Sequence, residues 1–205
     1  MRSWSLSLRT VVVVCGTLAL TGTASAAPPK PTTWLGEQIA GIRALVSPPV
    51  AGAVAAATAD ADAKLKAIID PVMEFDRLSE KALGKHWAGL KPDQRKTFID
   101  TFRELVFRSY LKKVRGANNE YTVAFEGETQ KGTTAVVEAV AKTKKAEIEL
   151  VFNLEPREDK RWVASDIVID EVSLVENYRE QFNKTLTSDG FDALISKMKK
   201  KLAEI

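Results

Sequence analysis

The chain has 205 residues, of which 45% are apolar, with 30 Lys and Arg against 27 Asp and Glu, one Cys and one His. A chain of this length can bury an ordinary hydrophobic core, and its mixed composition excludes disorder, a collagen-like repeat and a coiled coil. The single Cys excludes an internal disulfide framework, and the single His excludes a multi-histidine metal site within one chain.

The first 26 residues have the three-part plan of a bacterial secretory signal peptide. Arg2 and Arg9 form a basic start, residues 10–20 are an apolar run, and Ala24-Ser25-Ala26 is a small-residue cleavage site. The apolar run is about half the length of a membrane span. We therefore expect cleavage after Ala26 and a periplasmic mature protein. Cys15 lies inside the apolar run, which does not fit a lipid attachment site.

We expect residues 27–205 to form a single domain, because the sequence has no repeat and no long linker. Removing 26 residues leaves 179 without a Cys, and the loss of two arginines lowers the net charge from +3 to +1. Binding to nucleic acid requires clustered Lys and Arg that neutralise phosphates. The near-neutral mature chain therefore excludes nucleic acid as an expected partner.

Helical periodicity dominates the first part of the mature chain. Residues 34–46 predict an amphipathic helix that ends at Ser47-Pro48-Pro49. The Ala-rich residues 50–63 fit a loop or a frayed helix, and a helix is expected at 61–69.

Two further helices precede the strand region. Asp70-Pro71 predicts a cap and first turn for a helix that runs to about Trp87. The longest helix begins at Lys91-Pro92-Asp93 and ends at Gly116. It is apolar on most of its circumference, which is typical of an enclosed helix.

Residues 121–169 alternate between apolar and polar side chains, which is the period of half-buried strands. The turn-like segments QKGT, KTKK and EPREDK separate four such runs, which predicts a four-stranded antiparallel meander. Helical periodicity returns at Leu174, breaks at Ser188-Asp189-Gly190 and resumes at Phe191. This order predicts an α+β fold in which N- and C-terminal helices cover one face of a curved sheet.

The motifs of common catalytic and metal sites are absent. The sequence contains no Gly-rich phosphate loop, no HExxH, no CxxC and no G-x-S-x-G, and the mature chain has no thiol nucleophile. His86 has no spacing to a Ser or a carboxylate that would make it a general base. We therefore expect no catalytic residue, no metal site and no cofactor.

Two charged groups have functional alternatives. Asp166, Asp170 and Glu171 could form an acid/base set, but alternation turns Asp166 and Asp170 away from Ile167, toward solvent or a helix terminus. The lysines at 197, 199, 200 and 201 could contact anionic lipid or a partner. Lysine in a last helical turn also complements the helix dipole, and the solvated interpretation is favoured for both groups.

Large apolar side chains are in surplus on the longest helix and on the strands. Composition alone fits a dry core better than a ligand cavity, and periodicity does not distinguish the two. A pocket would be lined by side chains of the long helix, of the sheet and of the helix that follows it: Phe102, Val106, Tyr110, Phe125, Val137, Leu150, Phe152, Ile167, Val175 and Tyr178.

Two blocks of the sequence resemble the MlaC/toluene-tolerance family of periplasmic phospholipid-binding proteins. The first, residues 67–114, contains Pro71 to Phe75, Leu83-Gly84 before Trp87, Pro92-x-Gln94-Arg95, and Phe98, Phe102 and Tyr110. The second, residues 162–201, contains a last strand, a V-S-L-V turn, an N-Y-R-x-Q-F helix and a G-x-D-x-L-I helix. Residues 34–63 match the family poorly.

The resemblance implies a non-enzymatic, monomeric carrier that holds phospholipid acyl chains between sheet and helices and shuttles phospholipids between the outer and inner membranes. It also implies two partners, which are an outer-membrane lipoprotein–porin complex and an inner-membrane ABC transporter complex with its substrate-binding-type ring. Three alternatives stay open: a carrier of hopanoid or another polycyclic lipid, a small cone-shaped isomerase or dehydratase, and an adaptor with a dry core.

Overall fold

The computed structural model describes residues 29–46, 55–116, 121–144, 146–157, 159 and 161–205. The expected signal peptide, residues 1–26, lies outside the described residues. The elements in chain order are helices α1 (Pro31–Val46), α2 (Ala55–Met73) and α3 (Phe75–Leu83), the 3₁₀ helix η1 (Gly84–Gly89), α4 (Pro92–Gly116), strands β1 (Tyr121–Lys131), β2 (Thr134–Thr143), β3 (Glu147–Pro156), β4 (Trp162–Ile169) and β5 (Val172–Ser173), and α5 (Leu174–Glu204).

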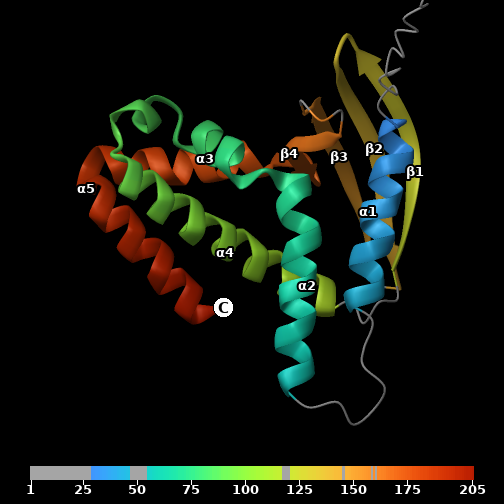
Figure 1. Cartoon of the computed structure of the whole chain (residues 1–205), viewed down its shortest axis with the longest axis horizontal. Coiled ribbons are helices and arrows are strands. Elements are labelled where there is room, and N and C mark those ends of the chain that lie inside the picture. The colour runs from blue at the N-terminus through green and yellow to red at the C-terminus, as the bar shows by residue number, and fades with distance from the viewer. Residues whose placement is uncertain (1–28, 47–54, 117–120, 145, 158, 160) are drawn as a thin grey trace, which may run out of the picture.

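The strands form one antiparallel sheet in the order β1-β2-β3-β4-β5. Figure 1 shows α1 and α2 side by side with the sheet, and α3, α4 and α5 grouped in a separate helical half. The predicted α+β fold is therefore confirmed. β5, a two-residue strand, is an addition to the four that the sequence predicts.

Residues that face each other across the ladders place one set of apolar side chains on one face of the sheet. Val137 pairs with Phe152, which pairs with Ile167, and in the next row Leu150 pairs with Ile169. Register shifts at Phe125/Gly127 and Asn153/Leu154 mark bulges. Because a bulge bends its strand and increases the local twist, these two positions give the sheet its curvature.

β5 forms because the chain reverses within two residues after β4. Asp170 and Glu171 both have positive φ, 46° and 66°, as in the two-residue turns that match the twist of a hairpin. Val172 and Ser173 then pair with Ile169 and Val168. Neither turn residue is Gly or Asn, so the sequence contains no ordinary signal for this turn.

The predicted helix start at Asp70-Pro71 is wrong. α2 continues through Pro71 to Met73, and the break lies at Glu74, which has a left-handed φ of 43°. The N–H of Glu74 still donates to the Asp70 carbonyl at 3.0 Å, which closes the last turn of α2. The expected extension to Trp87 is also wrong, since α3 ends at Leu83 and η1 follows from Gly84, whose φ is 50°.

α1 begins at Pro31, three residues before the expected start, and α2 extends the helix expected at 61–69 at both ends. The start of α4 and the break in α5 follow the sequence. The N–H of Lys91 donates to Gln94 Oε1 at 3.0 Å and so begins α4 without a Ser or Asp cap. The predicted break near Gly190 is present as a kink inside α5, where Gly190 has φ 81° and ψ −176°. Only glycine adopts this backbone conformation at low cost.

The helical half is held by an aromatic cluster. Phe98 and Phe102 stack at 5.6 Å between ring centroids, and the Phe182 ring meets both edge-on at 5.3 and 5.5 Å. Phe75 and Tyr178 meet the Phe102 ring at 6.2 and 5.0 Å. These edge-to-face contacts fill the space between α3, α4 and α5.

Candidate functional site

A cavity of ≈ 240 Å³ lies between α1 and α2 on one side and the curved sheet on the other. The end of α4 and the start of α5 complete its wall. Its lining side chains are Leu35, Gln38, Ile39, Ile42, Leu65, Ile69, Val72, Met73, Val106, Phe107, Tyr110, Leu150, Phe152, Ile167, Ile169 and Leu174.

The helical wall follows from spacing along α1 and α2. On α1, Leu35, Ile39 and Ile42 recur at four and three residues and therefore share one face. On α2, Leu65 and Ile69 are four residues apart and share a face in the same way. The two helices thus present a continuous aliphatic surface to the sheet.

The sheet wall follows from register. Phe152 and Ile167 face each other across β3 and β4, and Leu150 faces Ile169 one row further. Phe152 is buried, whereas the other three are only partly buried. The row of Leu150 therefore lies closer to solvent than the row of Phe152.

The lining residues include two polar side chains and no charged one. Gln38 Nε2 donates to the Trp34 carbonyl oxygen of its own helix at 3.4 Å. Burial raises the pKa of Tyr110, and the negative charge of Asp166 raises it further, so the hydroxyl stays neutral over the physiological range. A wall of this kind can accept hydrocarbon but cannot neutralise an ion.

The structure brings five of the ten predicted pocket residues to this cavity. They are Val106, Tyr110, Leu150, Phe152 and Ile167. The other five lie elsewhere. Phe102 and Tyr178 belong to the aromatic cluster, Val137 is completely buried in the sheet core, and Val175 is buried at the start of α5. Phe125 is 37% exposed and packs beside Gly36 of α1.

The prediction missed eleven lining residues: Phe107, Ile169 and Leu174, and eight more on α1 and α2, which it did not bring to the sheet. These eight are Leu35, Gln38, Ile39, Ile42, Leu65, Ile69, Val72 and Met73. The i, i+4, i+7 spacing of Leu35, Ile39 and Ile42 was a usable signal for the α1 face. Leu65, Ile69 and Val72 have the same spacing in the second half of α2, although the first half of that helix is rich in alanine.

Asp166 and Asp170, two members of the alternative acid/base set, accept hydrogen bonds from backbone N–H groups. Asp166 accepts hydrogen bonds from Ser173 Oγ at 2.5 Å and from the N–H groups of Ile167 and Val175 at 2.9 and 3.1 Å. Asp170 accepts from the N–H of Glu149 at 3.0 Å. The sequence allows Asp166 to face solvent or a helix terminus, and the structure shows the second orientation, since Asp166 joins β4 to the start of α5.

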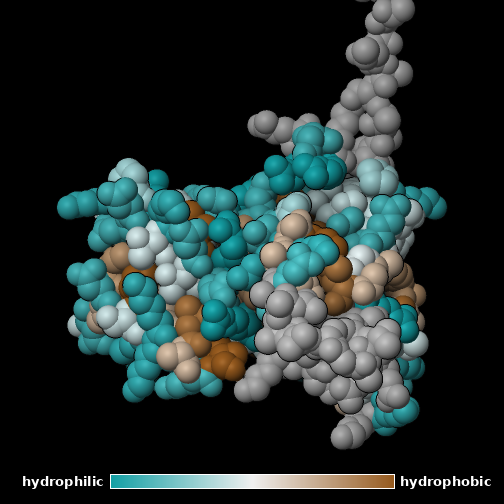
Figure 2. Space-filling model, turned by 60° about the horizontal axis from the view of Figure 1, so that its bottom comes forward, coloured by the Kyte–Doolittle hydropathy of each residue, from teal (hydrophilic) through white to brown (hydrophobic). Residues whose placement is uncertain are grey.

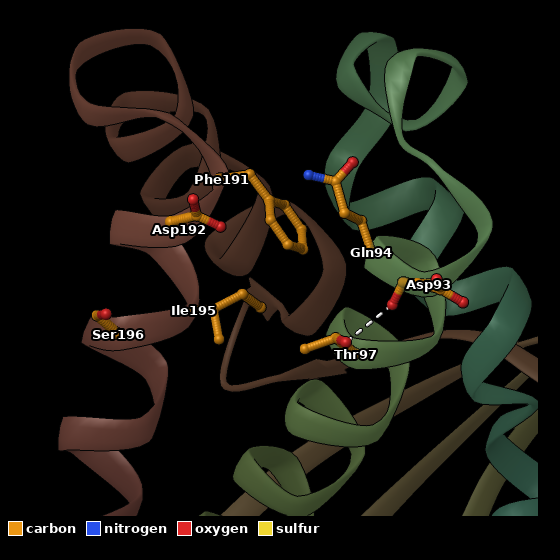
Figure 3. A pocket seen from close by; sticks show the side chains of 7 residues that line it. All are labelled: Asp93, Gln94, Thr97, Phe191, Asp192, Ile195 and Ser196. Atoms are coloured by element: carbon orange, nitrogen blue, oxygen red, sulfur yellow. Dashed lines mark hydrogen bonds between the residues drawn. The ribbon is translucent and has the colours of Figure 1, made fainter.

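A second hollow, of ≈ 380 Å³, lies between the start of α4 and the last part of α5. Figure 3 shows the Phe191 ring directed toward α4, with Gln94 and Asp93 opposite and the Thr97 hydroxyl donating to the Asp93 carbonyl oxygen at 2.8 Å. Although its volume is larger, this hollow is more open to solvent, and five of its seven lining side chains are polar or charged. The apolar cavity is therefore the better candidate site.

Within the described residues, no group of three or more His, Cys, Asp or Glu side chains could hold a metal ion. None of the described helices has the length and apolarity needed to cross a membrane. The fold and the cavity define the class of this protein, which is an α+β protein with an apolar cavity between its sheet and its helices.

The comparisons with known proteins identify the family within that class. The model of the MlaC protein family matches residues 52–200, and the chain therefore belongs to the MlaC family. It is 24% identical, over 139 residues, to the intermembrane phospholipid transport system binding protein MlaC of Haemophilus influenzae. The match covers 65% of this chain and 64% of the length of that relative.

A solved structure shares the fold. The phospholipid-binding protein of Ralstonia solanacearum, solved in complex with a phospholipid, superposes with a TM-score of 0.72 at 20% identity. The superposition covers 86% of this chain and 98% of that chain. The resemblance to the MlaC family is thus confirmed by a family match and by the fold.

Proposed function

We propose that the mature protein is a periplasmic carrier, not an enzyme, which binds the acyl chains of phospholipids in the cavity between α1, α2 and the sheet. It would move phospholipids between the outer and inner membranes. Its partners would be an outer-membrane lipoprotein–porin complex and an inner-membrane ABC transporter complex with its ring. A monomer suffices for this role, because one chain supplies the whole lining of the cavity.

The observation that carries this proposal is the uncharged and largely apolar lining of the cavity. Transfer of a chain of ~16 methylenes from a bilayer to water costs about 12 kcal/mol, at roughly 0.8 kcal/mol per methylene. A soluble carrier removes this cost if apolar walls replace the bilayer along the chain. The names of the two relatives, both phospholipid-binding, support the same cargo.

The lining of the cavity supports binding through the chains and not through the head group, because none of its side chains is charged. A polar head group would lack an ionic partner among the lining residues. We therefore expect the head group to remain in contact with water.

The direct test is mass spectrometry of the organic extract of protein purified from periplasm. Stoichiometric phospholipid is the expected result. A polycyclic lipid would replace the proposed cargo with the hopanoid alternative, and an extract without lipid would overturn a carrier function for either cargo.

A matched pair of variants tests the site. Leu150 and Val151 are adjacent in β3, are both half-buried and point to opposite faces of the sheet. We expect Leu150→Lys to lose bound lipid, because its ammonium group enters the hydrocarbon space, and Val151→Lys to retain it. Circular dichroism must show that both variants are folded. Equal lipid content in the two folded variants would contradict the proposed site.

A further inference from the structure

The charges on the surface are segregated, and one concentration of positive charge lies on the last turns of α5. Lys197, Lys199, Lys200 and Lys201 are all exposed, whereas Leu194 and Met198 on the same helix segment are buried in the core. The lysines therefore occupy the outer side of a helix whose apolar side is already used for packing.

Ion pairing removes only part of this charge. Lys197 Nζ pairs with Asp189 at 2.7 Å and Lys201 Nζ with Glu204 at 3.7 Å. Lys199 and Lys200 pair with no described residue. Stabilisation of a helix terminus falls off beyond the last turn and does not require four lysines, so the dipole accounts for only part of the cluster.

The face of the sheet that points away from the cavity, its outer face, is negatively charged. Glu138 on β2 and Glu149 on β3 are exposed and stand on that face, and Asp170 and Glu171 extend it at the turn after β4. Its basic residues at the register positions are Lys131, at the end of β1, and Lys142, which pairs with Glu147 at 3.1 Å. An anionic surface would therefore attract the end of α5 and repel the outer face of the sheet.

The last turns of α5 lie on the same side of the molecule as the end of α1 and the start of α2. In Figure 1 the last turns of α5 run toward the lower side of the view, to which the end of α1 and the start of α2 also point. Figure 2 brings that side forward and shows hydrophilic side chains over much of it, with apolar patches between them. Ile42 of α1, which lines the cavity, lies in the half of the helix nearest this side.

We propose that the lysine cluster of α5 docks the protein on an anionic lipid bilayer, with the outer face of the sheet turned away. This inference rests on the proposed function, because a lipid carrier has to meet a membrane. The contact is electrostatic and peripheral, since the apolar side of the helix is buried in the core. Each lysine near an anionic bilayer contributes about a fivefold increase in affinity.

Vesicle co-sedimentation at low salt tests the docking. We expect the protein to bind phosphatidylglycerol vesicles and not phosphatidylcholine vesicles, and rising salt to release it. Neutralising two lysines, in Lys199→Gln/Lys200→Gln, should weaken binding by about 30-fold. Inorganic phosphate at the same phosphate concentration should not compete, because a surface and not a single phosphate is recognised.

Lys85→Gln/Lys91→Gln is the control variant. It changes the net charge equally, but both lysines are exposed at η1 and the start of α4, at the other end of the helical half. We expect its binding to stay within about twofold of that of the unmodified protein. Equal losses in the two double variants, or no binding to anionic vesicles at low salt, would overturn the proposal. Lipid extracted from the variants should be unchanged, so the failure of docking and the failure of lipid binding are separate results.

Discussion

The two halves of this protein use apolar side chains in opposite ways. In the helical half, the rings of Phe75, Phe98, Phe102, Tyr178 and Phe182 meet at 5.0–6.2 Å between centroids. In the sheet half, the aliphatic surface of α1 and α2 faces a curved sheet and leaves ≈ 240 Å³ unfilled.

The difference lies in the shapes of the surfaces and not in their hydrophobicity. Planar rings on three helices pack edge to face and stacked, and they fill the space between the helices. Two helices laid on a sheet bent by bulges cannot follow its curvature along their whole length. An apolar surplus in a sequence therefore becomes core or cavity according to which elements meet.

The largest expected effect separates the two halves directly. Phe102 is 0% exposed and contacts four other rings, so Phe102→Ala should lower the free energy of unfolding by about 3–5 kcal/mol. Leu150 borders existing empty space and is half-buried, so Leu150→Ala should cost about 1 kcal/mol. Urea denaturation of the lipid-free variants measures both. Similar costs at the two positions would mean that the cavity wall is packed as tightly as the aromatic cluster.

The next prediction uses the phenol of the aromatic cluster. Burial, together with the nearby Tyr110, raises the pKa of Tyr178 to about 12. Because the folded state favours the neutral phenol, the stabilisation is present below pH ~10 and is lost as the pH rises toward 12. Between pH ~10 and 12, the free energy of unfolding of Tyr178→Phe should therefore fall by roughly 2–3 kcal/mol less than that of the unmodified protein.

Ultraviolet absorbance of the phenolate provides an independent measurement for Tyr178. The difference between the titrations of the unmodified protein and Tyr178→Phe should show one group with a midpoint of about 12. A midpoint near the ordinary value of ~10 would show that the aromatic half is more open to water than its packing implies.

The face on which each strand residue lies was easier to predict from sequence than the set of residues that line the cavity. Period-two alternation fixed the face of Leu150, Phe152 and Ile167, because a strand offers only two faces. The placement of Phe102 and Tyr178 failed for a different reason. A helix that is apolar all round does not reveal which neighbour covers each side, and these two rings face each other and not the sheet.

The contribution of α1 and α2 to the cavity required tertiary information. Helical spacing marks an apolar face on α1 and on the second half of α2, but it does not tell which surface that face covers. Proline at position 71 also gave the wrong boundary. α2 tolerates Pro71, and the backbone turns three residues later at Glu74, whose side chain pairs with Arg77 at 3.3 Å and Arg157 at 3.6 Å.

A moderate effect is expected where the two halves join. Asp166 on β4 accepts three hydrogen bonds at the start of α5, and a charged cap of this kind contributes about 1–2 kcal/mol. Asp166→Asn should therefore lower stability by that amount without changing the content of bound lipid. Asp192→Asn, at an exposed position of α5, should change stability by less than about 0.5 kcal/mol. Equal stability of the two variants would show that Asp166 does not hold the helix to the sheet.

The smallest predicted effect concerns the ion pairs between α3 and β3. Glu155 accepts from Lys81 Nζ at 2.7 Å and pairs with Arg77 at 3.0 Å. Burial acts to raise the pKa of Glu155, but the hydrogen bond and charge of Lys81 and the charge of Arg77 outweigh it, and the pKa is lowered. The stabilisation is therefore present above pH ~4.5 and is lost as the pH falls through the lowered pKa.

Glu155→Gln should cost less than about 1 kcal/mol at neutral pH, because the pair is partly exposed. The difference from the unmodified protein should shrink with added salt and disappear in acid, where both side chains are uncharged. Thermal unfolding at several pH values measures this, with Glu80→Gln, at an exposed position of α3, as the control. A difference that persists in acid would mean that Glu155 joins the two halves through packing and not through charge.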